Sequence, residues 1–298
     1  MSLVTPQKAS TKARRERLYS DVEFLSGIRP YRNYRNPVSL NRAADHISLE
    51  FKKASLESEE QKWTARGREY RNVIASYRPN DLWRLIVGAH YDAAGNQPGA
   101  DDNASGIAGM LETARMVTEN TPDTGYGIDF VAYCLEEPPF FGTEMMGSRV
   151  HAEFLFMKMT PVVGMVCYEM IGYFSDEPGS QDSPRGFSQG LYPDRGNFIA
   201  VVGVDKHGNF NERFYRLMAA DSEIDVRLAS FPDGGGFTGM SDQSSYRAFG
   251  YKAVMINDTS FLRNKNYHKK SDTTSTLDFE RMAQVISSAY NAVTGLGK

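Results

Sequence analysis

The run LIVGAHYD, which spans Leu85 to Asp92, gives the clearest indication of how this chain folds. Its first five residues are apolar or small without interruption, which is typical of a strand that is buried on both faces of a sheet. A histidine, His90, follows this run directly. Open α/β sheets bind ligands beyond the carboxyl ends of their strands, so we expect His90 to lie at such an edge.

Apolar runs of the same kind recur along the chain and alternate with segments that have helical periodicity. Further strands are expected over residues 128–135, 162–168, 198–204, 224–229 and 253–256, and helices over 104–119, 143–159, 210–221 and 278–293. Residues 61–77 predict two more strands that turn near Arg66 and Gly67. About eight strands interleaved with helices predict an α/β fold, a three-layer αβα structure with a largely parallel, mixed central sheet.

Two helices are expected ahead of the sheet, one within residues 8–28 and one that starts at Ser39. We expect residues 1–58 to pack as helices on a single domain that covers residues 1–298. No charged-then-apolar leader precedes the first helix, which indicates a cytoplasmic protein, or a secreted or periplasmic one if a leader has been removed.

The composition excludes several classes of partner. With a net charge of -3, the chain has no basic stripe that would indicate nucleic-acid binding. No apolar run approaches the roughly 20 residues that cross a membrane, so no membrane partner is expected. Cys134 and Cys167 lie in apolar runs, and we expect them to be buried free thiols.

Residue types that bind metals occur at the ends of the expected strands and in two loops between them. They lie in the motifs GAHYD (88–92), GADDNASG (99–106), CLEE (134–137), CYEM (167–170) and NYHKKSDT (266–273). The candidates are His90, Asp102, Glu136, Glu137, Glu169 and His268. Singly they have ordinary explanations, such as a helix cap for Asp102 and a surface position for His268. Together, so many carboxylates at one edge would repel one another without a cation between them.

Two zinc ions fit this set of residues. If Asp102 bridges them, His90 and Glu169 complete the first site. Glu137 and His268 then complete the second, and each ion keeps an open position. Such a pair shares a water molecule and lowers its pKa, which yields hydroxide at neutral pH. Mixed imidazole and carboxylate ligands favour zinc, although manganese and cobalt accept them too.

Two further acidic residues have expected roles beside the ions. Glu136 precedes a ligand at a strand end, where neighbouring side chains point opposite ways, so it can stand outside the coordination shell. There it can take the proton of the water and pass it to a leaving amine. Asp92, two residues after His90, is placed to orient that imidazole as an acceptor. Hydrolysis of a peptide bond is therefore the leading interpretation.

In this order, the motifs resemble those of the co-catalytic di-zinc aminopeptidases of metallopeptidase family 28, from about residue 85 to the C-terminus. The resemblance implies a zinc-dependent exopeptidase fold and two zinc ions per chain, held by His90, Asp102 (bridging), Glu137, Glu169 and His268. It implies Glu136 as the general base, and Tyr267 matches a position where some relatives have a tyrosine that steadies the oxyanion. The implied function is an aminopeptidase that removes N-terminal residues from peptides through a metal-bridging hydroxide. Glu136 and Glu169 would hold the free amine of the peptide substrate.

Three features depart from the family pattern. Glu169 stands where the family's aminopeptidases usually have aspartate. Gln243 replaces the histidine of a frequent SDH motif, and residues 138–146 (PPFFGTEMM) are longer than the common short turn. We therefore expect a reshaped rim and an altered substrate preference. The glycine-rich residues 233–240 predict a flap beside the cleft.

Three other functions stay open from the sequence. A glutaminyl cyclase with a single zinc ion would share the fold, but Gly99 to Gly106 and the intact His90 argue against it. A non-catalytic binding relative would share the fold too, but here every ligand position is filled. A carboxypeptidase would need a basic residue, such as Arg263 or Lys265, to face the substrate carboxylate. His46, His151 and His207 lie outside the motifs, and we expect structural roles for them.

Overall fold

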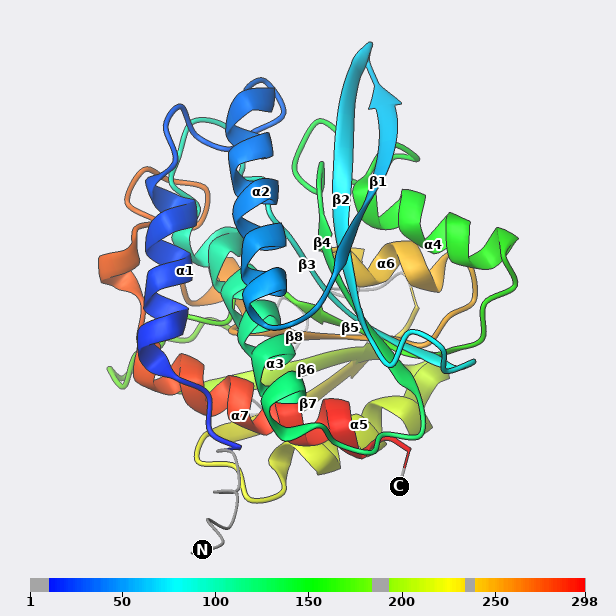
Figure 1. The fold of residues 1–298 in the computed structure, drawn as a ribbon. Coiled ribbons are helices and arrows are strands. Elements are labelled where there is room, and N and C mark those ends of the chain that lie inside the picture. Colours follow the sequence, from blue (N-terminus) through cyan, green and yellow to red (C-terminus); the bar gives the residue numbers. More distant parts are fainter. Residues whose placement is uncertain (1–10, 184–192, 234–238, 298) are drawn as a thin grey trace, which may run out of the picture.

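The computed structural model describes residues 11–183, 193–233 and 239–297, and its strands form one mixed sheet in the order β1-β2-β4-β3-β5-β8-β6-β7 (Figure 1). The strands are β1 (Ser58–Ala65), β2 (Arg68–Tyr77), β3 (Arg84–His90), β4 (Gly127–Tyr133), β5 (Val162–Tyr168), β6 (Phe198–Val204), β7 (Asp225–Phe231) and β8 (Ala253–Asn257). The helices are α1 (Arg15–Gly27), α2 (Pro37–Lys53), α3 (Gly106–Asn120), α4 (Gly147–Met157), α5 (Gly208–Ala219), α6 (Gln243–Arg247) and α7 (Phe279–Gly295). The predicted α/β fold with about eight strands is confirmed.

The four central strands β4, β3, β5 and β8 run parallel to one another. β2 and β6 run antiparallel to their neighbours β4 and β8, so the sheet is mixed as expected. Every residue of β3 is buried, in agreement with its apolar run. Because the parallel strands finish at one edge of the sheet, the segments that follow β3, β4 and β5 meet there.

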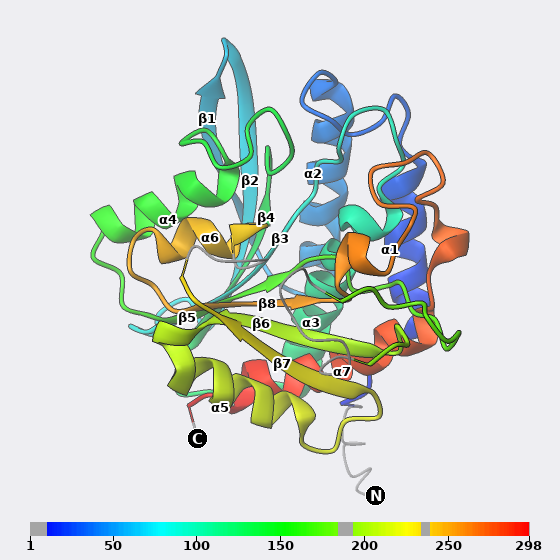
Figure 2. The ribbon, with the colours of Figure 1, turned by 180° about the vertical axis from the view of Figure 1, so that it is seen from behind.

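Helices cover both faces of the sheet and complete the three layers. α1, α2, α3, α5 and α7 lie on one face, and α4 and α6 lie on the other (Figures 1 and 2). The larger core, under the first group, includes Val87 and Phe130, whereas Ile86 and Val131 belong to the smaller core. Neighbouring residues enter different cores because side chains alternate across a strand.

The bounds of β5 and β6 agree with the predicted ones, and most other elements differ by a few residues at their ends. α1 begins only at Arg15, and residues 8–10 of the expected helix lie outside the described residues. α2 begins at Pro37 instead of Ser39, because proline suits the first turn of a helix. α6 was not predicted, since five residues are too few to show a helical period. Residues 234–238 of the expected flap lie outside the described part of the chain.

No helix in the described ranges combines the length and the apolarity that a membrane crossing requires. The groups that were expected to be structural lie in the cores or on helices. Cys134 and Cys167 are free and buried. His151 Nδ1 lies 2.5 Å from Tyr246 Oη, and burial lowers the pKa of His151 to about 4. His207 ends a short 3-10 helix after β6.

A buried arginine, Arg115 of α3, joins the two N-terminal helices to the rest of the protein. Its Nη1 lies 2.8 Å from Asp21 of α1, and its Nη2 lies 2.7 Å from Glu50 of α2. His46 Nε2 lies 3.2 Å from the same Asp21, which gives His46 a structural role. Removing one member of a buried ion pair leaves a charge without its partner, and that is strongly destabilising.

We expect Arg115→Met to lower the free energy of unfolding by about 3 kcal/mol, because Asp21 and Glu50 lose their buried partner. Urea denaturation followed by circular dichroism measures the change. Arg216→Met is the control: the Arg216 side chain is 75% exposed and pairs with Glu212 on the same helix, so its loss is expected to cost under about 0.5 kcal/mol. Equal stabilities of the two variants would contradict the prediction.

Candidate metal centre

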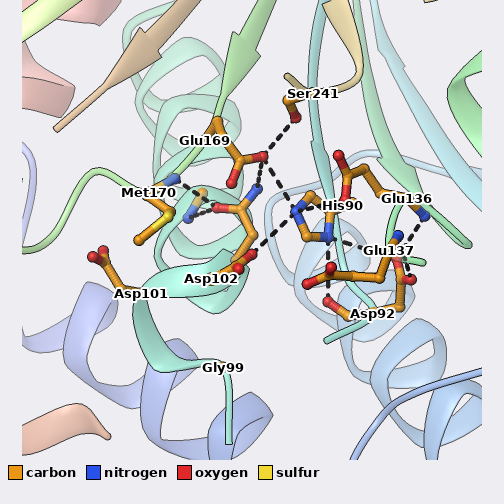
Figure 3. A network of polar contacts seen from close by, with 12 residues as sticks. His90, Asp92, Gly99, Asp101, Asp102, Glu136, Glu137, Glu169, Met170 and Ser241 are labelled. Carbon is orange, nitrogen blue, oxygen red and sulfur yellow. Dashed lines mark hydrogen bonds and ion pairs between the residues drawn. The ribbon is translucent and has the colours of Figure 1, made fainter. Parts of the chain in front are cut away.

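The candidate residues meet at the edge where the parallel strands finish, and Figure 3 shows those that lie around His90. His90 is the last residue of β3, and Glu169 directly follows β5. Asp102 lies in the turn that leads from β3 to α3, and His268 lies in the segment between β8 and α7. Residues that are far apart in sequence are thereby placed in one cluster.

The glutamate pair follows β4 differently from what the sequence indicated. β4 ends at Tyr133, so Glu136 and Glu137 lie in a loop, and strand alternation is the wrong explanation for their different directions. Glu136 Oε2 lies 3.8 Å from His90 Nε2, whereas Glu137 Oε2 lies 3.4 Å from His268 Nε2. The two carboxylates therefore face different imidazoles.

Two groups of possible metal ligands share one carboxylate. In the first, His90 Nε2 lies 3.2 Å from Glu169 Oε2 and 3.5 Å from Asp102 Oδ1. In the second, His268 Nε2 lies 3.0 Å from Asp102 Oδ2. Within each group, one ligand atom from every member lies within 4.8 Å of the others. The two oxygens of Asp102 thus face two different histidines, as those of a bridging ligand would.

The cluster has more buried negative charge than its imidazoles can balance. Asp102, Glu136, Glu137 and Glu169 are all at most 6% exposed. Among the described residues, Glu137 Oε1 has no hydrogen-bond partner although it is buried. Burying a charge without a partner is costly, so a cation at this position would stabilise the cluster. Carboxylate and imidazole ligands are a set that zinc accepts.

In the metal-free site, protons take the place of the cation. Burial raises the pKa of Glu137 to about 8 and raises the pKa of Glu136 well above its ordinary value. Burial acts to lower the pKa of His268, but hydrogen bonds to Asp102 and Glu137 outweigh it and raise that pKa to about 10. Glu137 and His268 therefore carry protons at neutral pH until a metal displaces them.

We expect zinc binding to the metal-free protein to release protons at pH 7 and to become tighter as the pH rises toward about 8. Both follow because the raised pKa values keep Glu137 and His268 protonated at pH 7, and only the deprotonated forms bind metal. Titration calorimetry in two buffers with different ionisation enthalpies counts the released protons. His268→Ala should release fewer. An affinity that falls between pH 7 and about 8 would contradict this prediction.

Asp92 supports the glutamate pair more than the imidazole. The nearest partner of His90 Nδ1 is the main-chain carbonyl of Asp92 at 3.2 Å, and the carboxylate lies at 3.6 Å. The carboxylate accepts hydrogen bonds from the amides of Glu136 and Glu137, both at 3.1 Å. Asp92 therefore orients the imidazole mainly through its main chain, and its side chain ties the loop after β4 to the end of β3.

An aspartate that the sequence did not single out, Asp272, holds the turn that contains Asp102. Its two oxygens accept from the amides of Asp101 and Asp102 at 2.9 and 3.2 Å. Asp272 is the aspartate of the SDT triplet that follows His268, so the motif already contained it. Its role could not be predicted, because the contact joins residues 170 positions apart.

Asn103 provides the helix cap that the sequence offered as an alternative role for Asp102. Asn103 Oδ1 accepts from the amide of Gly106 at 3.0 Å, at the start of α3, and from the amide of Met170 at 3.1 Å. Its Nδ2 donates to the carbonyl of Tyr168 at 2.9 Å. The Asp102 carboxylate is thereby left to face the two histidines.

The longer side chain of Glu169 has its own partners. Ser241 Oγ donates to Glu169 Oε2 at 2.6 Å, and Asn257 Nδ2 donates to the main-chain carbonyl of Glu169 at 2.6 Å. Asp242 is fully buried beside Ser241, and burial raises its pKa to about 7. Gln243 is buried at the start of α6. The extra methylene of Glu169 is thus held in place by hydrogen bonds at both ends of the residue.

The long segment 138–146 forms part of the rim and packs on the β1–β2 hairpin. Phe140 is buried, with its ring centroid 5.5 Å from that of Tyr34 and 6.2 Å from that of Tyr70. Trp63 Nε1 donates to the carbonyl of Met145 at 3.0 Å. The segment is therefore anchored by the hairpin and by the chain that connects α1 and α2.

A pocket adjoins the centre beside Glu169 and Tyr267. Its apolar lining comes from β6, β7 and β8 and the segment before α6, and includes Ala200, Val202, Ala229, Phe231, Met240 and Met255. The Tyr267 ring stacks on His268 with centroids 3.8 Å apart. Burial raises the pKa of Tyr267, so its hydroxyl stays protonated at neutral pH. An aliphatic side chain suits such a pocket.

The basic residues that a carboxypeptidase would need have other partners. Arg263 is 2% exposed, and it donates to Gln181 Oε1 at 2.9 Å and to the carbonyl of Phe198 at 2.9 Å. Lys265 pairs with Asp182 at the surface, 2.5 Å away. These contacts argue against the carboxypeptidase interpretation, in which one of the two residues would face a substrate carboxylate.

The model of peptidase family M28 matches residues 72–293. The chain belongs to this family. Membership makes it a hydrolase of the peptidase class, in a family that is generally zinc-dependent. The resemblance that the motifs carried is confirmed.

Similar chains support the assignment. YfbL of Escherichia coli (strain K12) is 39% identical over 290 residues, 95% of this chain and 87% of that one. The probable leucine aminopeptidase 1 of Trichophyton verrucosum is 28% identical over 246 residues, 76% of this chain. This M28 chain spans 58% of the length of that aminopeptidase.

Two solved structures share the fold of this M28 peptidase. The LapA aminopeptidase of Legionella pneumophila superimposes with a TM-score of 0.76 at 18% identity, over 96% of this chain and 73% of that one. The glutaminyl cyclase of Fimbriiglobus ruber gives 0.72 at 21% identity, over 99% and 100%. These likenesses establish the architecture only, because both activities occur on it.

Proposed function

We propose that this M28 peptidase is a zinc-dependent aminopeptidase with two zinc ions per chain. The observation that carries the proposal is the position of Asp102, whose oxygens lie 3.5 Å from His90 Nε2 and 3.0 Å from His268 Nε2. The proposed ligands are His90, Asp102 and Glu169 for one ion, and Asp102, Glu137 and His268 for the other. When bound, such ions activate water and polarise the carbonyl of the substrate.

Glu136 is the proposed general base. It lies farther from His90 Nε2, at 3.8 Å, than the carboxylates of Glu169 and Asp102 do. Burial raises the pKa of Glu136 above that of an ordinary glutamate, which makes the carboxylate a stronger base. Glu136 would take a proton from the attacking water and deliver it to the leaving amine as the peptide C–N bond breaks.

The proposed substrate is a peptide with a free N-terminus and an aliphatic first residue. The apolar pocket lies directly beside Glu169, so a side chain in the pocket places its own α-amine near the carboxylates of Glu169 and Glu136. Tyr267, at the same boundary, keeps its proton at neutral pH and can donate a hydrogen bond to the developing oxyanion. Each substrate group thus has a partner of suitable charge.

A single-zinc glutaminyl cyclase is the second candidate, because a solved cyclase shares the fold. Such an enzyme would leave one of the two groups of ligands without an ion. Here His90 Nε2 lies within 3.5 Å of both Glu169 and Asp102, and His268 faces the other oxygen of Asp102. Two complete groups favour two ions and hydrolysis.

Zinc analysis combined with product analysis tests the proposal. We expect close to two zinc ions per chain and removal of the first residue from a leucine-initiated peptide. The same peptide with an acetylated amine should stay intact, and a glutamine-initiated peptide should be shortened. Pyroglutamate without shortening, together with one zinc ion per chain, would establish the cyclase. A purified protein with neither zinc nor activity would leave only a non-catalytic relative.

A further inference from the structure

The N-terminal part of the chain contributes a buried arginine, Arg32, next to the loops of the candidate metal centre. Arg32 lies in the connection between α1 and α2, outside the residues that the family model matches. Its exposed fraction is 1%, although arginine is rarely buried so completely. Among the described residues no carboxylate lies within ion-pair distance of its guanidinium.

The guanidinium of Arg32 instead binds main-chain carbonyls on two loops that contain proposed ligands. Its Nε donates to the carbonyl of Tyr91 at 2.8 Å, the residue that separates His90 from Asp92. Its Nη1 donates to the carbonyl of Pro98, and its Nη2 donates to that of Gly99. One planar group therefore joins the end of β3 to the turn that leads into Asp102.

Further contacts fix the same junction. Arg32 Nη1 also donates to the carbonyl of Leu25 near the end of α1, 3.2 Å away, and the amide of Ala93 donates to the carbonyl of Arg32 at 2.9 Å. Gly99 has a φ of +61°, and a side-chain carbon there would lie 2.3 Å from the carbonyl oxygen of Asp102 and 3.1 Å from Arg32 Nη2. The turn is thus closed tightly around the guanidinium.

We propose that Arg32 is a positioning residue for the metal centre, which sets the spacing between the loop of His90 and the loop of Asp102. Those loops supply ligands to the same ion in the proposed function, on which this inference rests. A guanidinium suits this role because its donors form a rigid fork, whereas a lysine ammonium is a point charge on a flexible stem. The positive charge also offsets part of the negative charge that the cluster buries.

The consequence is that the N-terminal segment contributes to metal binding and turnover as well as to stability. Asp92, next to Tyr91, holds the amides of Glu136 and Glu137. A shift of the Tyr91 carbonyl would therefore reach the general base and a ligand of the second ion. Residues that orient metal ligands typically change metal affinity or activity by about 10–100-fold when replaced.

The test compares Arg32→Met, Arg32→Lys and a matched control, Arg84→Met, in the full chain. Arg84 is a buried arginine at the opposite end of β3, where its Nε donates to Asp129 Oδ2 at 2.9 Å. Three quantities are measured for each protein: the melting temperature without metal, the zinc affinity by competition with a chromophoric chelator, and kcat and KM at saturating zinc. Leucine p-nitroanilide is the substrate.

We expect Arg32→Met to weaken zinc binding by at least about tenfold and to lower kcat by a similar factor with little change in KM. Arg32→Lys should recover only part of the zinc affinity and of kcat, because lysine restores the positive charge but lacks the forked donors of the guanidinium. Arg84→Met should lower the melting temperature and leave zinc affinity and kcat unchanged. If Arg32→Met does not fold, the lysine variant decides.

A lysine variant with the zinc affinity and kcat of the unmodified protein would overturn the inference. An Arg32→Met variant with a lower melting temperature but unchanged zinc affinity and kcat, as expected for Arg84→Met, would also overturn the inference. Absence of zinc from the unmodified protein would instead overturn the proposed function and, with it, this inference. The unmodified protein therefore distinguishes the two failures.

Discussion

Glu136→Gln is expected to lower kcat by about 10²–10⁴-fold while both zinc ions stay bound. The amide keeps the size and shape of the carboxyl group, but it cannot take a proton from the attacking water. The six ligand positions, with Asp102 counted in both groups, stay intact because Glu136 belongs to neither of them. The measurement combines the rate with leucine p-nitroanilide and the zinc content of the same sample.

A surface glutamate provides the control for this substitution. Glu153 is exposed on α4, so Glu153→Gln should leave kcat and zinc content unchanged. If Glu136→Gln kept the full rate with two zinc ions bound, the general base would have to be another residue. A loss of zinc together with the rate would instead place Glu136 among the ligands.

Asp102→Asn is expected to remove or weaken both ions, whereas His268→Ala should remove only one. The two oxygens of Asp102 face the two histidines, so its replacement affects both groups of ligands. His268 belongs to one group only. Replacing a residue that only supports a ligand lowers activity by about 10–100-fold. We expect kcat to fall further than this in both variants.

Zinc content after gel filtration into metal-free buffer, with circular dichroism to confirm folding, measures the difference. Glu153→Gln is again the comparison, because it removes one carboxylate charge at an exposed position of α4 that belongs to neither group of proposed ligands. Two tightly bound ions in Asp102→Asn would rule out a bridging role. Equal losses in the Asp102 and His268 variants would show that the two sites do not fill independently.

Much of the sheet could be predicted because the information is local. Val162–Tyr168 and Phe198–Val204 are strands with the expected bounds, since an uninterrupted apolar run has one stable place in a sheet that is covered on both faces. The same local rule misplaced the end of β4. Cys134 and Leu135 are apolar, but Leu135 has a φ of +65°, which lies outside the β region that a regular strand needs.

The candidate residues could also be found from the sequence, since parallel strands deliver their final residues to one edge. That argument placed His90 and Glu169 at strand ends, and the structure has them there. It did not show which oxygen of Asp102 faces which histidine. It gave Asp92 a contact with the imidazole, which the structure has at 3.6 Å, but it did not show that the same carboxylate binds the amides of Glu136 and Glu137.

By itself, then, the sequence determined the layer order, the parallel centre of the sheet and the set of residues at its edge, because each depends on periodicity or on spacing along the chain. Tertiary structure alone decided how Asp272 and Arg32 hold the loops of that edge. Their hydrogen bonds to these loops join segments 59 or more residues apart and involve main-chain groups, which no side-chain pattern reveals. The types of side chain in the sequence determine the chemistry of the site, whereas the backbone around them determines its geometry.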